Sequence, residues 1–220
     1  MRPVLVTGFE PYGGRGSNPA YDTMRAVDGR NIGGVDVIGR ALPVAIASIR
    51  TNIAMLLDEI SPSAVISLGL WPGEPMIRLE RIGINIADFE IPDNEGAIYR
   101  DIEISGNGTP ARMASLPLRK IEQALLAAGI PVRLSSTAGT FLCNACLYGF
   151  LEAIDRRPRN IPCGFIHLPY TPEQVAQLVA DIGNGKVLEQ HQRADLVSME
   201  LSRIIRAVEI AIGTTVQTLA

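Results

Sequence analysis

Short apolar runs alternate with longer amphipathic segments along this chain of 220 residues. Continuous apolar or β-branched runs that end at turn residues are typical of buried strands. Segments whose apolar residues lie three to four positions apart are typical of helices that cover a core. The pattern predicts strands at 3–8, 35–44, 63–70, 132–136 and 163–168, and helices at 19–29, 45–60, 116–128, 142–155 and 192–212.

Two segments depart from this alternation. Residues 76–88 have apolar side chains at every second position, with a phase change between Arg81 and Ile82, which predicts a strand with a bulge. Residues 95–110 are polar and rich in glycine, which indicates an exposed excursion between elements. Whether this excursion is a lid or an oligomer contact stays open.

Two helices carry start signals in the sequence. Asn18 followed by Pro19 suits the N-cap and the first helical position. Thr171 with Gln174 three residues later forms a capping-box pattern, so a further helix is expected to begin there.

The order of these elements sets the fold class. Strands alternate with helices throughout, which predicts an α/β fold with a mostly parallel central sheet and helices on both faces. No repeat or linker divides the chain, so a single domain is expected over residues 1–220. Reactive groups in such sheets gather at the carboxyl ends of strands, here in the loops 8–18, 70–75, 137–143 and 167–171.

Composition narrows the class of protein. The chain is 47% hydrophobic and 20% charged, as expected for a globular domain. Its net charge of −3, without a basic run, gives no reason to expect nucleic acid or a membrane surface as partner. No apolar stretch approaches the roughly 20 residues that span a bilayer. Three cysteines without an export signal favour a reducing compartment, so a cytoplasmic protein is expected.

The segment 138–150, AGTFLCNACLYGF, holds two of the three cysteines. Together with Cys163 and His167, Cys143 and Cys146 come near the spacing of a zinc site. On one strand, however, Cys163 and His167 would lie about 13 Å apart, too far to share one ion, so no metal is expected. Cys143 and Cys146 also match a redox pair, but the neighbours of Cys146 are apolar, which favours a packing role.

A nucleophilic role suits Cys143 better. It follows a strand and a tight loop at the start of a helix, where the helix dipole and free N–H groups lower a thiol pKa and stabilise an oxyanion. His167 lies at the carboxyl end of a strand, whereas His191 lies in a polar stretch and is expected to be solvated. The third member stays open: Glu80 is either the orienting carboxylate or a surface residue paired with Arg78 or Arg81.

Asp88 and Asp93 are weaker candidates for that carboxylate, because the segment IPDNEG around Asp93 has the composition of a turn.

Four separated blocks then resemble one known family: LVTGFEPYGG with Asn18–Pro19, LERIGIN with IPDNEG, TAGTFLCN, and GFIHLPYTPEQ. The chain resembles, up to about residue 180, the pyrrolidone-carboxylate peptidases (pyroglutamyl peptidase I), cytoplasmic cysteine peptidases that remove an N-terminal pyroglutamate. The resemblance implies Cys143, His167 and Glu80 as catalytic residues, and an open α/β/α sandwich around a twisted sheet. It implies no metal or organic cofactor, and a homodimer or homotetramer.

The resemblance also implies a mechanism and a pocket. His167, oriented by Glu80, would take the Cys143 proton or sit with the thiolate as an ion pair, and the sulfur would attack the pyroglutamyl carbonyl. An apolar slot would hold the lactam ring of a peptide or small amide. The expected substrate-binding residues are Phe9, Tyr12, Asn18, Ile91, Phe141 and Leu142.

One loop departs from the family's pattern. Where the family has a GQAGGR-like run, this chain has GLWPGEP at 69–75. The Gln position is Leu70, small residues become Trp71 and Pro72, and the Arg falls on Glu74. A lost hydrogen bond and a reversed charge each cost about 1–3 kcal/mol. Two alternatives therefore stay open: a cysteine amidohydrolase for a related lactam or N-terminal acyl group, and a non-catalytic binding relative with a rebuilt pocket.

Overall fold

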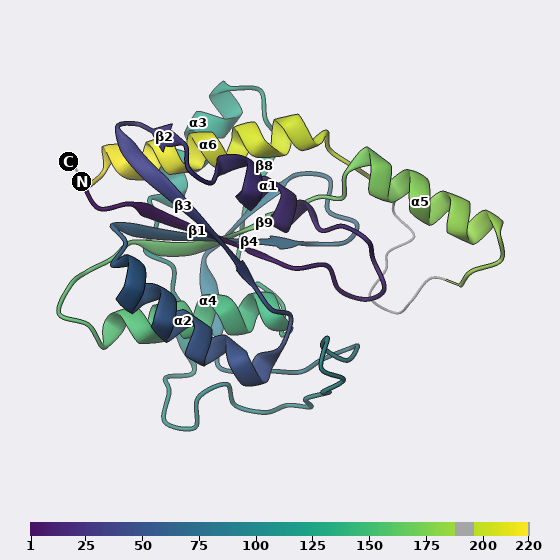
Figure 1. Cartoon of the computed structure of the whole chain (residues 1–220), viewed down its shortest axis with the longest axis horizontal. Helices are drawn as coiled ribbons and strands as arrows, with labels where there is room; N and C mark the ends of the chain where they lie inside the picture. Colours follow the sequence, from purple (N-terminus) through teal and green to yellow (C-terminus); the bar gives the residue numbers. More distant parts are fainter. Residues whose placement is uncertain (188–195, 220) are drawn as a thin grey trace.

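A seven-stranded sheet in the order β2-β3-β1-β4-β9-β5-β8 forms the centre of the computed structural model, which describes residues 1–187 and 196–219 (Figure 1). Neighbouring strands are parallel except for the pairs β2–β3 and β9–β5. The predicted mostly parallel sheet is thus confirmed. The strands are β1 (Val4–Phe9), β2 (Asn31–Ile32), β3 (Val35–Leu42), β4 (Ala64–Leu70), β5 (Ile77–Glu80), β8 (Val132–Ser135) and β9 (Cys163–Leu168).

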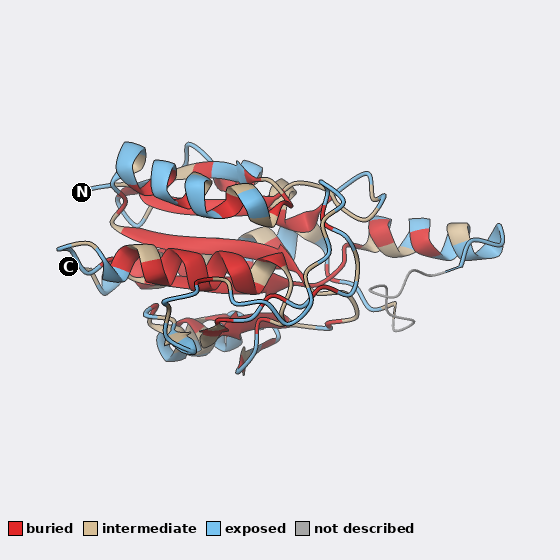
Figure 2. Cartoon of the chain, turned by 90° about the horizontal axis from the view of Figure 1, so that it is seen from below, coloured by how far each residue is buried: buried red, intermediate tan, exposed pale blue. Residues whose placement is uncertain are grey.

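Helices cover both faces of this sheet, which confirms the predicted α/β/α sandwich. Helices α1, α3 and α6 lie on one face and α2 and α4 on the other, while α5 extends away from the sheet (Figure 1). The buried sides of these helices face the sheet and their exposed sides face outward (Figure 2). The helices are α1 (Pro19–Val27), α2 (Ile46–Ile60), α3 (Leu118–Ala127), α4 (Leu142–Asp155), α5 (Pro172–Gly183) and α6 (Leu201–Gln217).

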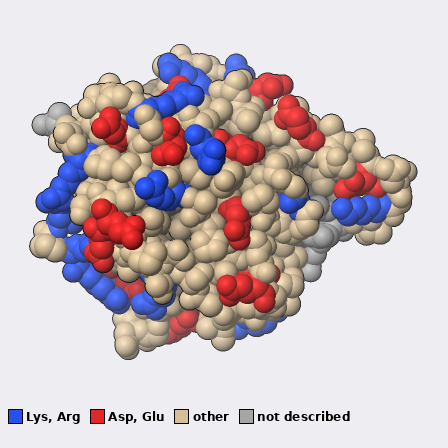
Figure 3. Space-filling model, viewed as in Figure 1, with Lys and Arg blue, Asp and Glu red and all other residues tan. Residues whose placement is uncertain are grey.

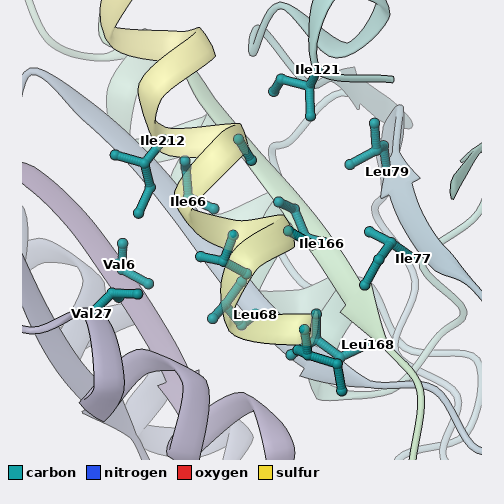
Figure 4. Close-up of a cluster of buried hydrophobic side chains, with 14 of the residues drawn as sticks. Val6, Val27, Ile66, Leu68, Ile77, Leu79, Ile121, Ile166, Leu168 and Ile212 are labelled. Atoms are coloured by element: carbon teal, nitrogen blue, oxygen red, sulfur yellow. The ribbon is translucent and has the colours of Figure 1, made fainter. Parts of the chain in front are cut away.

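The continuous apolar strands reflect burial on both faces, as is usual for parallel sheets. Alternate residues of one strand enter different cores: Val65 packs toward α2 and α4, whereas Ile66 and Leu68 pack toward α6. Figure 4 shows Ile66, Leu68 and Ile166 of the sheet lying along α6, with Ile66 next to Ile212 of that helix.

The antiparallel pairing of β5 with β9 determines which polar side chains meet. Arg78 lies opposite His167, and Glu80 lies opposite Phe165. Successive side chains of a strand point to opposite faces. Because Phe165 belongs to the core under α4, the side chains of Arg78, Glu80 and His167 all lie on that face.

The predicted continuous strand at 76–88 is wrong. The chain leaves the main sheet at Arg81, and β6 (Ile82–Ile84) pairs with β7 (Ala111–Met113) in a separate two-stranded sheet. The phase change at Arg81 therefore marks a change of sheet and not a bulge. Gly83 permits close packing on α4, because a Cβ there would lie 3.0 Å from the backbone N of Tyr148.

Both helix starts that carry a signal in the sequence are confirmed. Asn18 Oδ1 accepts a hydrogen bond from Ala20 N at 3.0 Å, and Thr171 with Gln174 forms a complete capping box. The last helix begins at Leu201 and continues past the predicted end to Gln217. Residues 192–195 of its predicted start, and the predicted solvated helix position of His191, lie outside the described residues.

The outer surface mixes charges. Acidic and basic side chains are interspersed over the face shown in Figure 3, in line with the small net charge of −3. Among the helices of residues 1–187 and 196–219, none combines the length and the apolar character needed to cross a membrane.

Candidate active site

Cys143 is the second residue of α4 and lies directly over the sheet. Its Sγ is only 2.7 Å from the position that a Cβ would occupy on Gly69, so glycine is required there. Gly69 of β4 is the register partner of His167 on β9. Since paired strands lie about 4.8 Å apart, the thiol is placed beside the histidine.

The start of α4 leaves hydrogen-bond donors free for a ligand. Phe141 occupies the N-cap and provides no side-chain hydrogen bond, unlike Asn18 and Thr171 at α1 and α5. The first N–H groups of a helix have no partner within the helix. The N–H groups around Cys143 are therefore suited to donate hydrogen bonds to a negatively charged oxygen.

The loop before Cys143 is held by the segment that follows β6. Asn144 accepts a hydrogen bond from Ile84 N and donates to the carbonyl oxygens of Ile84 and Ile86, all at 2.9 Å. Asp88 N donates a hydrogen bond to Thr140 O at 3.1 Å, and the Thr140 hydroxyl Oγ1 donates to Asp88 O at 2.6 Å. These contacts hold the N-terminal end of α4 in a fixed position against residues 84–88.

His167 bonds directly to Glu80. Its Nδ1 lies 2.8 Å from Glu80 Oε1, and the two side chains are 1% and 0% exposed. Glu80 also accepts a hydrogen bond from Arg78 Nε at 3.1 Å. The alternative that Glu80 faces the surface is thus wrong, while its pairing with Arg78 is confirmed.

The other two acidic candidates have different partners. Asp93 is buried and accepts hydrogen bonds from the backbone N–H groups of Ile46, Glu95 and Ala97. These bonds attach the turn around Asp93 to the start of α2. Asp88 is exposed and pairs with Arg100 at 3.7 Å.

The electrostatics keep Glu80 ionised. Burial alone would raise the pKa of Glu80, but the hydrogen bond and charge of His167 and the charge of Arg78 oppose it, so the pKa lies below 4.5. An ionised carboxylate only accepts hydrogen bonds, and His167 Nδ1 therefore donates. This tautomer leaves the lone pair on Nε2.

His167 and Cys143 are both expected to be neutral at pH 7. Burial first, and then Arg78, lower the pKa of His167 below 6.5 despite Glu80. Burial raises the pKa of Cys143 well above 9.0, and Cys146 and Glu80 add to the rise. The lowered thiol pKa expected from the helix start is therefore wrong, because desolvation of the sulfur outweighs the helix dipole.

A cavity of about 180 Å³ opens beside these residues and is lined by both Cys143 and His167. Its walls are largely aromatic and aliphatic: the ring centroids of the lining residues Phe141 and Tyr12 lie 6.1 Å apart, and Phe89, which does not line the cavity, supports Phe141 at 4.5 Å. The lining contains all six predicted substrate-binding residues, Phe9, Tyr12, Asn18, Ile91, Phe141 and Leu142.

Asn18 has a second task besides lining the cavity. Its Oδ1 caps α1, and its Nδ2 donates to Glu10 O at 3.0 Å. An amide can accept and donate twice, so one acceptor position and one donor hydrogen remain for a ligand.

The loop 70–75 forms another wall. Leu70, Trp71 and Pro72 line the cavity, and the Trp71 ring meets the His167 ring edge-on at 4.9 Å between centroids. Glu74 is buried and bonds both Arg78 and Arg133. The sequence did not predict these contacts of Trp71 and Glu74; the spacing of two residues between Arg78 and Glu80 on one strand was a signal only for their mutual pairing.

A family model described as pyroglutamyl peptidase matches residues 2–218. The chain belongs to the pyroglutamyl peptidase family, a family of cysteine peptidases. It is 42% identical over 176 residues to the pyrrolidone-carboxylate peptidase of Enterobacter sp. (strain 638), which covers 80% of this chain and 82% of that relative. It is 38% identical over 219 residues to that of Thermococcus litoralis, covering 100% and 95% of the two chains.

Solved structures of the pyroglutamyl peptidase family have the same fold. The pyrrolidone carboxyl peptidase from Pyrococcus furiosus superposes with a TM-score of 0.90 at 37% identity, over 99% of this chain and 100% of that chain. The structure from Thermococcus litoralis gives 0.89 at 38% identity, over 100% and 95%. The similarity therefore extends well beyond residue 180, where the recognised sequence blocks end.

Two arginines balance the buried negative charge in the loop 70–75 of this chain. The negative charge of buried Glu74 is met by Arg78 and Arg133. Leu70 is buried at the cavity and presents only an apolar side chain to it.

The remaining cysteines do not join a second centre. Cys146 and Cys163 are buried and free, and burial raises the pKa of Cys146 to about 12. Within residues 1–187 and 196–219, no three His, Cys, Asp or Glu side chains lie close enough to hold a metal ion. Cys146 packs in the core under α4, as predicted.

Proposed function

We propose that this protein removes an N-terminal pyroglutamyl residue from peptides by acyl transfer through Cys143, His167 and Glu80. The observation that carries the proposal is the buried hydrogen bond of 2.8 Å between His167 and Glu80, next to Cys143 in a cavity with aromatic walls. Family membership supports the same substrate, since the matching family model is described as pyroglutamyl peptidase.

The first half-reaction forms a thioester. His167 Nε2 accepts the proton of the Cys143 thiol while Sγ bonds to the pyroglutamyl carbonyl carbon. The carbonyl oxygen becomes an oxyanion that accepts hydrogen bonds from N–H groups at the start of α4. As the tetrahedral adduct collapses, the C–N bond breaks, and the imidazolium returns its proton to the leaving amine.

The second half-reaction restores the enzyme. Water enters after the amine has left and gives a proton to His167 Nε2 while its oxygen bonds to the thioester carbon. The C–S bond then breaks, pyroglutamate leaves, and Cys143 recovers its proton from the imidazolium. Glu80 stabilises the imidazolium in both steps and stays ionised, because its pKa lies below 4.5.

The neutral starting states favour general-base catalysis over a resting ion pair. Forming a thiolate in the buried site is costly until a substrate carbonyl is in place. The burial that raises the pKa of Cys143 and lowers that of His167 supports this order of events.

The test is release of a fluorescent amine from a pyroglutamyl amide. Wild type is expected to turn over, Cys143→Ala to lose essentially all activity, and the matched control Cys146→Ala to retain it. Absence of turnover by the wild type, or full activity of Cys143→Ala, would overturn the proposal.

Leu70 favours a second candidate, hydrolysis of a related amide whose ring lacks the lactam's polar groups. An apolar side chain at this position cannot bond a lactam N–H or C=O. A cyclopentanecarbonyl amide has a ring of the same size without these groups. Faster turnover of that amide than of the pyroglutamyl amide, reversed in Leu70→Gln, would support the second candidate.

A further inference from the structure

Arg78 is a buried arginine that no step of the proposed reaction uses. Its Nε donates to Glu80 Oε1 at 3.1 Å, and its Nη1 donates to Glu74 Oε2 at 3.3 Å. Its Nη2 donates to Ser135 Oγ at 2.7 Å and to Thr137 O at 2.9 Å. An arginine cannot lose its proton in a protein, so a full positive charge stays beneath the cavity.

Arg78 also contacts Trp71, which, like Glu80, is a direct neighbour of the His167 imidazole. Its guanidinium lies 3.8 Å from the centroid of the Trp71 ring, and the same ring meets His167 edge-on at 78°. Trp71 carbons also lie 3.4 Å and 3.5 Å from where a Cβ on Gly139 would be. The indole therefore contacts both Arg78 and the loop before Cys143.

The cation has counter-charges on both sides. Glu74 is buried and bonds Arg78 and the half-exposed Arg133, while Glu80 bonds Arg78 and His167. Burying an unpaired charge is very costly, so removing one member leaves the others destabilised. The negative charge of Glu74 is thus matched by a cation from β5, two residues before Glu80.

We propose that Arg78 is a positioning residue, which fixes the Glu80 carboxylate and the Trp71 ring and thereby holds His167 in its reactive orientation. Arg78 does not line the cavity and acts only through these two side chains. The inference rests on the proposed function for its kinetic part, whereas its effect on the imidazole does not depend on any substrate.

The charged and titratable groups that face His167 come from three elements. They are Arg78 and Glu80 on β5, Glu74 in the loop 70–75, and Cys143 on α4, which lines the cavity together with His167. Removing the positive charge of Arg78 makes protonation of the imidazole easier, because the two carboxylates then act without opposition.

The experiment compares Arg78→Met and Arg78→Lys with Arg50→Met. Arg50 is a matched control because it also bonds a buried carboxylate, Glu152, at 3.2 Å. The chain has two histidines, so an NMR pH titration in a His191→Gln background reports on His167 alone. Steady-state kinetics with a pyroglutamyl amide are measured over the same pH range.

For Arg78→Met, kcat is expected to fall by roughly 10- to 100-fold with little change in KM, as for other groups that orient a reactive side chain indirectly. The NMR midpoint of His167 and the acidic limb of kcat/KM are expected to move together to higher pH. Arg78→Lys keeps the charge but not the planar fork, so the midpoint stays near wild type while kcat still falls. Arg50→Met changes neither.

Unchanged kcat together with an unchanged His167 midpoint in Arg78→Met would overturn the positioning role. If that variant does not fold, Arg78→Lys decides, and wild-type kcat in it overturns the proposal. If the wild type does not hydrolyse the amide, the proposed function fails, and the shift of the His167 midpoint still supports or refutes the action of Arg78.

Discussion

Two buried carboxylates on the α4 side of the sheet have similar partners and different surroundings. Glu80 bonds Arg78 and His167, while Glu152 accepts hydrogen bonds from Ser105 Oγ at 2.7 Å and from arginines. The side chain of Arg78 is 7% exposed, whereas the side chain of Arg50 beside Glu152 is 49% exposed. Solvent therefore screens the pairs of Glu152 but not those of Glu80.

The difference shows what a buried ion pair can and cannot indicate. Glu152 joins α4 to the excursion after β6, because Ser105 in turn exchanges hydrogen bonds with Asn85 at 2.8 Å. Glu80 bonds an imidazole whose ring also lines a cavity. Both carboxylates are buried and paired. They differ in their partners, because His167 also lines the cavity whereas the partners of Glu152 do not. This difference separates a structural carboxylate from a candidate catalytic one.

The largest contrast is expected in activity. Glu80→Gln keeps the shape but loses the charge that stabilises the imidazolium and fixes its tautomer, so kcat should fall by about 10²- to 10⁴-fold. Glu152→Gln touches no group of the cavity and should leave kcat/KM within about threefold of wild type. Both are measured with a pyroglutamyl amide.

Circular dichroism of both variants serves as the control for folding. A folded Glu80→Gln with wild-type kcat, or a folded Glu152→Gln that loses activity, would remove the distinction between the two carboxylates.

Much of the fold follows from the sequence, because long apolar runs and helix caps are local signals. Helix 142–155 and strand 163–168 are found with the predicted bounds. Strand direction is not local: nothing in MIRLERIGI shows that β5 runs antiparallel to β9 or that β6 joins another sheet. Both features depend on which strands pair with each other as the whole chain folds.

The residues of the candidate site also differ in how far the sequence alone could predict them. Cys143 and His167 were recognisable because each stands at a predicted junction of strand and helix. Glu80 remained undecided from its own surroundings, since an acidic residue next to arginines suits a surface as well as a core. The network of Trp71, Arg78 and Glu74 could not be predicted, because it is formed by a loop and a strand that meet only in three dimensions.

The second contrast concerns stability. Glu152→Ala removes the acceptor of Ser105 and two ion pairs, so the free energy of unfolding should fall by about 1–3 kcal/mol. Hydrogen exchange should rise at Ser105, which loses its tie to α4. Thermal and urea unfolding measure the loss, and Asp58→Ala, which breaks the exposed pair with Arg157, is the matched control. Equal losses in the two variants would contradict a structural role for Glu152.

The third contrast is in the pH dependence of kcat/KM. Only neutral His167 can act as base, and its pKa lies below 6.5, so the acidic limb should have its midpoint below pH 6.5. Because the charge of Glu80 raises the pKa of His167, Glu80→Gln should move the midpoint of the residual activity to lower pH. Glu152→Gln should leave it in place. A wild-type midpoint above pH 6.5 would contradict the assignment of a neutral His167 beside a neutral Cys143 at pH 7.

The smallest contrast is in salt dependence, measured by double-mutant cycles of unfolding for Arg50 with Glu152 and for Arg78 with Glu80. The half-exposed Arg50 pair should contribute only about 0.2–1 kcal/mol at low salt. Raising NaCl from about 0.1 M to about 1 M shortens the screening length from about 10 Å to about 3 Å, so this coupling should weaken. The Arg78 pair is shielded from solvent and should keep its coupling. Equal salt sensitivity of both pairs would mean that water reaches Glu80, and the low-dielectric setting assigned to the His167 pair would then be wrong.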